Sequence, residues 1–243
     1  MNCGEFEQRN TDYYNNFSPE KYFRQLVLGN SIKREPPSLD WYGQGKTIFD
    51  VGSHKGESAI FFHGIFPESK IYSFEPIPFA AENIINLALK NVSVFQMALS
   101  DFNGSADFYV QDISHLSSLN KINRKSKHSM GYASDEKHKK ITVDVVRGDT
   151  FIKSQDIVEI DLLKIDVQAN EVKTIQGFSD VLDKIKIVFV EVSFYDFYDN
   201  RSVIKNIEAS LPSFEFYDIY EISKNPKTLG TDWATLVYKN QNL

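Results

Sequence analysis

Short apolar runs alternate with amphipathic segments along the chain from residue 47 onward. An apolar run at residues 47–52 is followed by a helical pattern from Gly56 to about Phe62. A second run at residues 70–76 precedes a predicted helix at residues 79–90, and residues 92–99 form the third predicted strand. Strands that alternate with helices are typical of a parallel sheet covered by helices on both faces.

The same alternation continues toward the C-terminus. Residues 186–192 are almost continuously apolar, as expected of a strand buried on both faces. The other predicted elements are a strand at 161–167, helices at 171–175 and 200–211, and final strands at 214–222 and 233–239. Since no helical pattern separates the last two strands, they should run antiparallel to each other. The sequence therefore predicts a doubly wound, Rossmann-like α/β fold with a seven-stranded, mostly parallel sheet and an antiparallel C-terminal edge hairpin strand.

Two regions depart from this rhythm. Residues 101–104 carry a turn signal for a hairpin, followed by alternating residues 106–110 and a further strand at 141–146. Residues 111–140 have little periodicity and are interpreted as a lid-like insertion. Residues 1–45 are interpreted as a helical N-terminal extension, with a helix that begins at Ser18 and ends near Gly29, before a catalytic domain at 46–243.

Composition and charge narrow the function classes. The chain has 243 residues, a formal net charge of −6 and one cysteine, Cys3, which excludes an intramolecular disulfide and a cysteine-based zinc site. The N-terminal residues lack a signal-peptide pattern, and no apolar run is long enough for a membrane helix. We therefore expect a cytoplasmic protein that binds neither membranes nor, given its acidity, a nucleic-acid backbone.

Basic residues nevertheless gather in one stretch, which favours either of two interpretations. The stretch could recognise a phosphate or carboxylate on a substrate, or it could be a solvated loop. Its basic members are Lys121, Arg124, Lys125, Lys127, Lys137, Lys139 and Lys140.

The most specific local pattern follows the first predicted strand: Asp50-Val-Gly52-Ser-His-Lys-Gly56. Glycines at the carboxyl end of a strand let the backbone turn tightly and approach a ligand closely. The pattern is not a P-loop, because no Gly-Lys-Ser/Thr follows, and it lacks the third glycine of the dinucleotide fingerprint.

Glu75 ends the second predicted strand, 25 positions after Asp50. A carboxylate at this place can accept hydrogen bonds from both ribose hydroxyls of an adenosyl ligand, as the equivalent acid does for dinucleotides. Under the alternative interpretation Asp50 caps a helix, the glycines form a plain turn and Glu75 is exposed.

Together these motifs resemble those of the FkbM-type methyltransferases, a branch of the class I S-adenosylmethionine-dependent enzymes. The resemblance covers roughly residues 46–240, in matching order and spacing. Its pieces are Phe49-Asp-Val-Gly-Ser-His-Lys-Gly56, Phe74-Glu-Pro76, Ala98-Leu-Ser-Asp101, Ser117-Ser-Leu119, Asp149-Thr-Phe151 and Asp161-Leu-Leu-Lys-Ile-Asp-Val-Gln168 followed by Glu171. The family usually has Ala-Asn in place of Ser53-His54, a departure that leaves both glycines intact. It usually has Gly followed by an apolar residue in place of Ala169-Asn170, a departure beside the expected substrate pocket that bears on acceptor specificity.

The resemblance implies S-adenosylmethionine as the cofactor and assigns residues to its parts. The loop after the first strand would line the methionine end, Glu75 would hold the ribose, and Met97 and Ala98 would flank the adenine. Asp166 would lie near the sulfonium, where a carboxylate suits the positive charge. The implied cofactor-binding residues are Asp50, Gly52, Ser53, Gly56, Glu75, Pro76, Met97, Ala98 and Asp166.

Transfer to an alcohol also requires removal of a proton, and Asp166, Glu191 and His115 are the candidate catalytic residues. Each has another interpretation: Asp166 could only position the cofactor, Glu191 could be paired structurally, and His115 could be an exposed loop residue. Glu171 is a further candidate base, although it could simply favour a helix N-terminus. No compact motif supports a metal held by Asp166 and Glu191.

The resemblance implies O-methylation of a sugar or another small-molecule or glycan acceptor. N-methylation, protein methylation and a non-catalytic binding module that retains the fold remain as alternatives. A nucleotide-dependent oxidoreductase would need the missing third glycine and a hydride-site Tyr/Lys or Cys, neither of which stands out.

Overall fold

A computed structural model describes residues 46–123, 125, 138–224 and 231–243. The predicted N-terminal extension with its helix, Cys3, and Arg124, Lys127 and Lys137 of the basic stretch lie outside the described residues. Within the described residues, no helix is long and apolar enough to cross a membrane.

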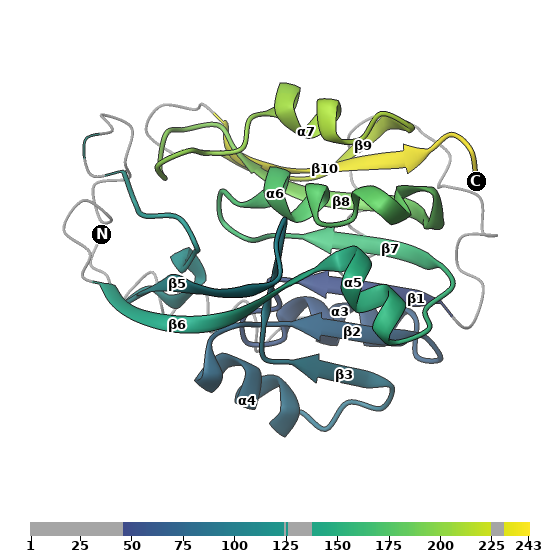
Figure 1. The fold of residues 1–243 in the computed structure, drawn as a ribbon, viewed down its shortest axis with the longest axis horizontal. Coiled ribbons are helices and arrows are strands. Elements are labelled where there is room, and N and C mark those ends of the chain that lie inside the picture. Colours follow the sequence, from purple (N-terminus) through teal and green to yellow (C-terminus); the bar gives the residue numbers. More distant parts are fainter. Residues whose placement is uncertain (1–45, 124, 126–137, 225–230) are drawn as a thin grey trace.

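A seven-stranded sheet forms the centre of the molecule, with the strand order β3-β2-β1-β7-β8-β10-β9 (Figure 1). Its strands are β1 (Thr47–Val51), β2 (Lys70–Phe74), β3 (Val92–Phe95), β7 (Ile160–Ile165), β8 (Ile185–Ser193), β9 (Phe214–Lys224) and β10 (Thr231–Asn240). The first five strands in this order are parallel, whereas β10 runs antiparallel to both β8 and β9. The predicted Rossmann-like fold with an antiparallel C-terminal hairpin is therefore confirmed.

The strands alternate with short helices. These are α3 (Glu57–Ile65), α4 (Pro78–Asn86), α5 (Gly148–Ser154), α6 (Glu171–Gln176) and α7 (Ile204–Ser210), with 3-10 helices η2 (Ser114–Leu116) and η3 (Ser179–Lys184). In Figure 1, α5, α6 and α7 lie in front of the sheet and α3 lies behind it. The pattern of the sequence predicted neither α5 nor η3, because seven and six residues are too few to show a helical period.

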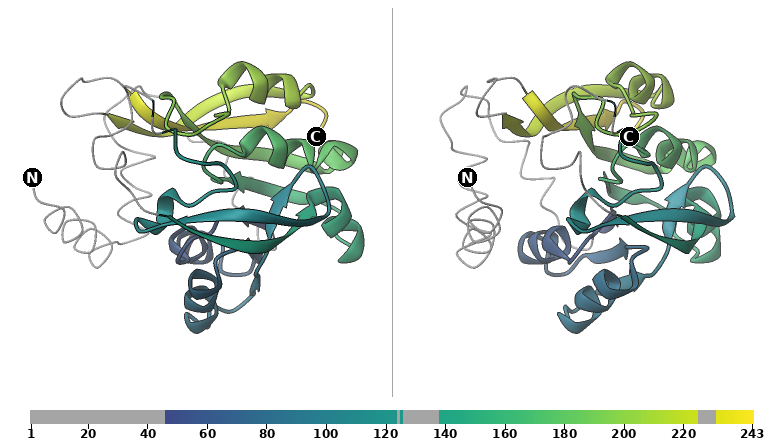
Figure 2. Two further views of the ribbon diagram at one scale, coloured as in Figure 1. Left: turned by 60° about the vertical axis from the view of Figure 1, so that its left-hand side comes forward. Right: turned by 90° about the vertical axis from the view of Figure 1, so that its left-hand side faces the viewer.

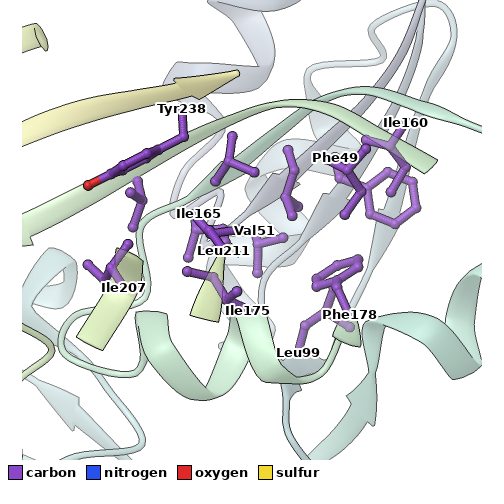
Figure 3. Packing of buried hydrophobic residues seen from close by; sticks show 14 of the residues in the cluster. Phe49, Val51, Leu99, Ile160, Ile165, Ile175, Phe178, Ile207, Leu211 and Tyr238 are labelled. Carbon is purple, nitrogen blue, oxygen red and sulfur yellow. The ribbon is translucent and has the colours of Figure 1, made fainter. Parts of the chain in front are cut away.

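The two faces of the sheet carry different apolar clusters, as the alternation of side chains along a strand requires. Phe49 and Val51 pack with Phe178 and Ile175 on the face of α5, α6 and α7 (Figure 3). Ile48, one position along the same strand, packs with side chains of α3 on the opposite face. Burial of each such large side chain stabilises the fold by roughly 1.5–3 kcal/mol, so β1 is held firmly between two layers.

A second, three-stranded sheet lies beside the carboxyl ends of the main strands, in the order β4-β6-β5 (Figures 1 and 2). It consists of β4 (Ala98–Ser100), β5 (Gly104–Gln111) and β6 (His138–Arg147). The prediction of one strand over residues 92–99 is wrong, because the chain leaves the main sheet after Phe95 and Ala98 pairs with Val145 of β6. Because the three residues of β4 continue the apolar pattern of β3, the sequence pattern could not show that the chain changes sheets between them.

The hairpin predicted around residues 101–104 is also wrong. β4 and β5 do not pair with each other, because β6 lies between them, parallel to β4 and antiparallel to β5. Arg147 holds the connecting turn in this arrangement. Its backbone amide donates to Asn103 Oδ1 at 2.8 Å, and its guanidinium donates to the carbonyl of Asp101 at 2.8 Å.

Three predicted boundaries shift in the structure. The helix predicted at residues 79–90 ends at Asn86, since Ala88 and Asn91 have positive φ angles. The helix predicted at residues 200–211 begins only at Ile204, because Ser202 bonds across to the loop before α6. The predicted insertion at residues 111–140 is shorter, because the antiparallel ladder of β5 and β6 continues to the pair Gln111–His138.

Candidate active site

The loop between β1 and α3 is tied closely to the ends of two neighbouring strands. The amides of Gly52 and Ser53 both donate to the carbonyl of Phe74 in β2, at 3.0 and 3.2 Å. The Ser53 hydroxyl, which is buried, donates to the carbonyl of Asp50 at 2.8 Å. Ser53 therefore shapes the loop from inside.

Both glycines of this loop have conformations that a side chain would strain. Gly52 has φ +81°, and a Cβ there would lie 1.8 Å from the Asp166 carbonyl oxygen. Gly56 has φ +98°, and a Cβ there would lie 2.8 Å from Leu87 Cδ1. Left-handed backbone favours glycine. The loop thus approaches β7 more closely than any other residue would allow.

Asp50 is completely buried and forms an ion pair with Lys164 of β7. The distance from Lys164 Nζ to Asp50 Oδ1 is 3.1 Å, and the Ser58 hydroxyl donates to Asp50 Oδ2 at 2.7 Å. Burial lowers the pKa of the Lys164 ammonium, but the charges of Asp50 and Asp166 outweigh this and raise it above its usual range. Since Lys164 Nζ also donates to the Gly52 carbonyl at 2.7 Å, Asp50 acts on the loop through this lysine.

Glu75 lies directly after β2 and is 4% exposed. The backbone amides of His54 and Ile77 donate to its Oε2 and Oε1 at 2.9 and 2.8 Å. Burial raises the pKa of the Glu75 carboxyl to about 7, although these two amides lower it. A carboxylate offers about four acceptor positions, so Glu75 can accept two further hydrogen bonds. Two ribose hydroxyls would supply them.

The other predicted cofactor residues lie around Glu75. Pro76 is buried immediately after it. Met97 is half-buried against the main core, and its amide donates to the Phe95 carbonyl at 2.9 Å. Ala98 is 7% exposed and packs into the apolar cluster of Ile77 and the second sheet. Met97 and Ala98 therefore follow the end of β3 on the side next to Glu75, as an adenine position requires.

Two predicted catalytic carboxylates, Asp166 and Glu191, are brought together at the ends of β7 and β8. Gln168 bridges them: its Nε2 donates to Asp166 Oδ1 at 2.8 Å and to Glu191 Oε1 at 3.0 Å. Burial and the negative charge of Asp166 raise the pKa of Glu191 well above its usual value, and Lys164 only partly opposes this. A carboxyl whose pKa is raised toward neutral pH suits proton transfer.

The hydroxyl of Tyr198 contacts the oxygen of the Gln168 side-chain amide. It lies 2.9 Å from Gln168 Oε1 and also 2.9 Å from the carbonyl of Leu116. Gln168 and Ala169 have φ angles of 54° and 77°. Strained backbone of this kind costs about 1–3 kcal/mol per residue and gathers at functional sites.

Glu171 begins α6 and is also buried, with 4% exposure. The amide of Ala169 donates to its Oε1 at 2.8 Å. Burial raises the pKa of Glu171 to about 7, while hydrogen bonds from its own amide and from Ser202 lower it. Its place in the first turn of α6 suits the helix N-terminus electrostatically, as the alternative interpretation of Glu171 holds.

His115 lies on η2 above the glycine loop, and its side chain is exposed. Its ring meets the ring of His54 edge-on, with centroids 6.2 Å apart. His54 also contacts Ser114 Oγ at 2.8 Å and Glu57 Oε1 at 3.2 Å. Desolvation and His54 lower the pKa of His115. η2 is thus joined to the loop that precedes α3.

The pattern of the sequence assigned no separate role to Lys164 or Gln168. A lysine within an apolar strand is itself a signal, because a buried charge requires a partner. Gln168 carries no such signal, and its contact with Tyr198, 30 positions away, appears only in the folded protein. Among the described residues, no group of three or more His, Cys, Asp or Glu side chains is placed to hold a metal ion.

These features together define a cofactor site of the adenosyl-binding α/β class. The glycines let a ligand approach the backbone closely at the end of β1. Glu75 has acceptor positions left for hydroxyl donors such as those of a ribose, and Asp166 provides negative charge for a cation. The donor set therefore fits S-adenosylmethionine, whose sulfonium is positive and whose ribose has two hydroxyls.

Comparison with known proteins agrees with this fit. The family model for the FkbM methyltransferase domain matches residues 50–222. The chain is 29% identical over 201 residues to the 2-O-methyltransferase NoeI of Sinorhizobium fredii, covering 80% of this chain and 78% of that protein.

Solved structures are similar at a lower level. The FkbM methyltransferase of Methylobacillus flagellatus is 13% identical with a TM-score of 0.49, and the similarity covers 94% of this chain but only 52% of that chain. Fibrillarin of Aeropyrum pernix with bound S-adenosyl-L-methionine is 14% identical with a TM-score of 0.48, covering 88% of this chain and 72% of that chain.

The chain therefore belongs to the FkbM methyltransferase family. It is a methyltransferase, and S-adenosylmethionine is its cofactor.

Proposed function

We propose that this enzyme methylates a hydroxyl oxygen on a sugar or another glycan acceptor. The observation that carries the proposal is the pair of carboxylates Asp166 and Glu191, bridged by Gln168 beside the cofactor loop. A neutral amine reacts without losing a proton first, whereas a hydroxyl needs a base as it reacts. The similarity to a protein named as a 2-O-methyltransferase supports the same choice.

Glu191 is the proposed base. When bound, S-adenosylmethionine would supply a methyl group on positively charged sulfur, and breaking of the S–CH₃ bond would leave a neutral thioether. The acceptor oxygen forms the new O–C bond while its proton passes to a Glu191 carboxylate oxygen. Gln168 holds that carboxylate in place through the bond to Oε1, and Tyr198 holds Gln168.

Asp166 keeps its charge near the transferred group and also sets the basicity of Glu191. Its carboxylate lies 3.7 Å from Lys164 Nζ and is partly exposed toward the site. Because two negative charges repel, Asp166 makes Glu191 bind a proton more strongly. η2 contacts the loop through Ser114 and His115, which both meet His54.

A Glu191→Gln variant tests this assignment. The amide keeps the shape and the contact with Gln168 but cannot take the proton, so kcat should fall by about 10²–10⁴-fold. Affinity for S-adenosylmethionine, measured by titration calorimetry, should remain. The matched control is Glu82→Gln, an exposed change on α4, which should leave turnover intact.

The pH profile separates base catalysis from a structural effect. Turnover should rise with pH through the pKa of Glu191, and Asp166→Asn should move this rise to lower pH because the repelling charge is gone. A panel of hydroxylated and amine acceptors, assayed by S-adenosylhomocysteine release, identifies the acceptor atom. Turnover on amines alone would favour the N-methyltransferase alternative, and unchanged turnover in Glu191→Gln would overturn the assignment.

A further inference from the structure

A cavity of about 320 Å³ lies between the small sheet and the segment that follows η2. It is separate from the glycine loop and Glu75. Its lining comes from β5, from β6, from residues 121–123 and 125, and from the segment after β8. The lining residues are Tyr109, Gln111, Lys121, Ile122, Asn123, Lys125, His138 and Asp199.

Backbone pairing builds the walls of this cavity. Tyr109 pairs with Ser118, and Ile122 pairs with Tyr198. The amide of Asn123 donates to the carbonyl of Phe197 at 2.8 Å, and the amide of Asp199 donates to the carbonyl of Lys121 at 2.8 Å. The cavity is therefore a formed part of the fold.

The cavity presents positive charge. Lys121 Nζ lies 5.4 Å from the centre of the Tyr109 ring, a cation–π distance, and the ring of His138 meets the same tyrosine edge-on. In the part of the chain that the structure describes, neither Lys121 nor Lys125 forms an ion pair with a carboxylate. Among the described lining residues, two ammonium groups and the one carboxylate of Asp199 leave an excess of positive charge, which suits an anion.

Gln111 adds an independent signal. Its side chain is 4% exposed, and its Oε1 is buried without a hydrogen-bond partner among the described residues. Its backbone amide donates a hydrogen bond to the Ser117 hydroxyl oxygen at 3.0 Å. A buried acceptor without a partner destabilises the folded protein, and a ligand that donates a hydroxyl or N–H would remove this penalty.

The cavity adjoins the proposed reaction centre through Tyr198. A more open depression of about 530 Å³ shares Asn123 and Asp199 with the cavity and also includes Tyr198. The Tyr198 hydroxyl contacts Gln168, the residue that bridges Asp166 and Glu191. Tyr198 therefore belongs both to this depression and to the hydrogen-bonded group around Gln168.

We propose that this cavity binds an anionic sugar unit of the acceptor, next to the unit that is methylated. The negative group, a carboxylate or a phosphate, contacts Lys121 and Lys125, and a sugar hydroxyl or an amide N–H donates to Gln111 Oε1. This inference rests on the proposed function, because it names the acceptor class for the same site.

Direct binding tests the cavity without turnover. The probes are glucuronic acid, glucose 6-phosphate and glucose, with dissociation constants from protein-observed NMR titrations. The two anionic sugars should bind about tenfold or more tightly than glucose, and rising salt should weaken only their binding. The tighter of the two identifies carboxylate or phosphate as the preferred group.

Variants locate the binding. A Lys121→Gln/Lys125→Gln double variant should reduce the affinity for the anionic sugars to that for glucose. Lys139→Gln is the matched control, because Lys139 is an exposed lysine of β6 outside the cavity lining. This variant should bind the anionic sugars as the wild type does. Gln111→Met should weaken sugar binding without lowering the urea midpoint, since it removes a buried acceptor that has no partner.

The outcomes separate this inference from the proposed function. Equal binding of glucose and the anionic sugars, or unchanged binding in the double lysine variant, overturns the cavity assignment even where methyl transfer to hydroxyls is observed. Selective anion binding by wild type and by Glu191→Gln supports the cavity whatever the turnover assay shows, because Glu191 does not line it.

Discussion

Gly52 lies against the backbone of Asp166, so closely that a Cβ at position 52 would be 1.8 Å from the Asp166 carbonyl oxygen. The amide of Asp166 in turn donates to the carbonyl of Val51 at 3.0 Å. The cofactor loop and the carboxylate proposed to face the sulfonium are thus one packed unit. A disturbance of the loop must therefore reach the reaction centre.

A Gly52→Ala change should destabilise the fold and weaken cofactor binding together. The left-handed backbone alone costs about 1–3 kcal/mol for a residue with a side chain, and the clash with a backbone atom adds to it. Urea denaturation and S-adenosylmethionine titration measure the two effects. Gly104→Ala is the control: Gly104 also has a positive φ, of 149°, but a Cβ there meets nothing nearer than 3.9 Å. Equal losses of stability and cofactor affinity in both variants would show that the contact with Asp166 does not contribute to either.

Glu75 should determine cofactor affinity through the ribose. Glu75→Ala removes two charge-assisted hydrogen bonds and should weaken S-adenosylmethionine binding by about 10- to 100-fold or more. Glu75→Gln should cost less, because the amide oxygen still accepts one hydroxyl. Titration calorimetry measures both, with the exposed Glu82→Gln as the reference. Undiminished binding by Glu75→Ala would contradict the ribose role.

Lys164 should be required for stability because it is the counter-charge of a buried carboxylate. Lys164→Met leaves Asp50 buried without its partner and should destabilise the fold by about 3–5 kcal/mol. The double variant Asp50→Asn/Lys164→Met removes both charges and should recover much of this loss. Urea denaturation of the wild type, both single variants and the double variant completes the cycle. Additive losses would mean that the two charges do not depend on each other.

Glu171 should make stability depend on pH. Burial raises its pKa in the folded protein to about 7, above its ordinary value of 4.5. The folded state therefore holds the proton more strongly, and the stabilisation, complete below about pH 4.5, is lost as pH rises through 7. In Glu171→Gln the fall in unfolding free energy between about pH 5 and 8 should be smaller by about 2–3 kcal/mol. An identical pH dependence in this variant and the wild type would exclude Glu171 as its source.

Much of the site was predictable because its residues follow strands directly. Asp50, Gly52 and Glu75 could be placed from the sequence, since the carboxyl ends of parallel strands meet at one edge of a sheet. The approach of Asp166 to Glu191 followed from the same rule, applied to β7 and β8. That they lie close together depends on the pairing of β7 with β8, which the structure shows.

The remaining features depend on contacts between distant parts of the chain. The break between β3 and β4 could not be predicted, because an apolar strand looks the same whichever sheet it joins. Gln168 and Tyr198 meet only because residues 121–123 pair with residues 197–199.

The sequence by itself determined the fold class and the cofactor edge of the molecule, because hydrophobic period and glycine placement are local properties. The tertiary structure alone decided the acceptor side. Whether Glu191 is a useful base depends on how deeply it is buried and on the charge of Asp166, and the partner missing at Gln111 depends on every neighbour around it. Burial and electrostatics are sums over residues far apart in the chain, so no local pattern records them.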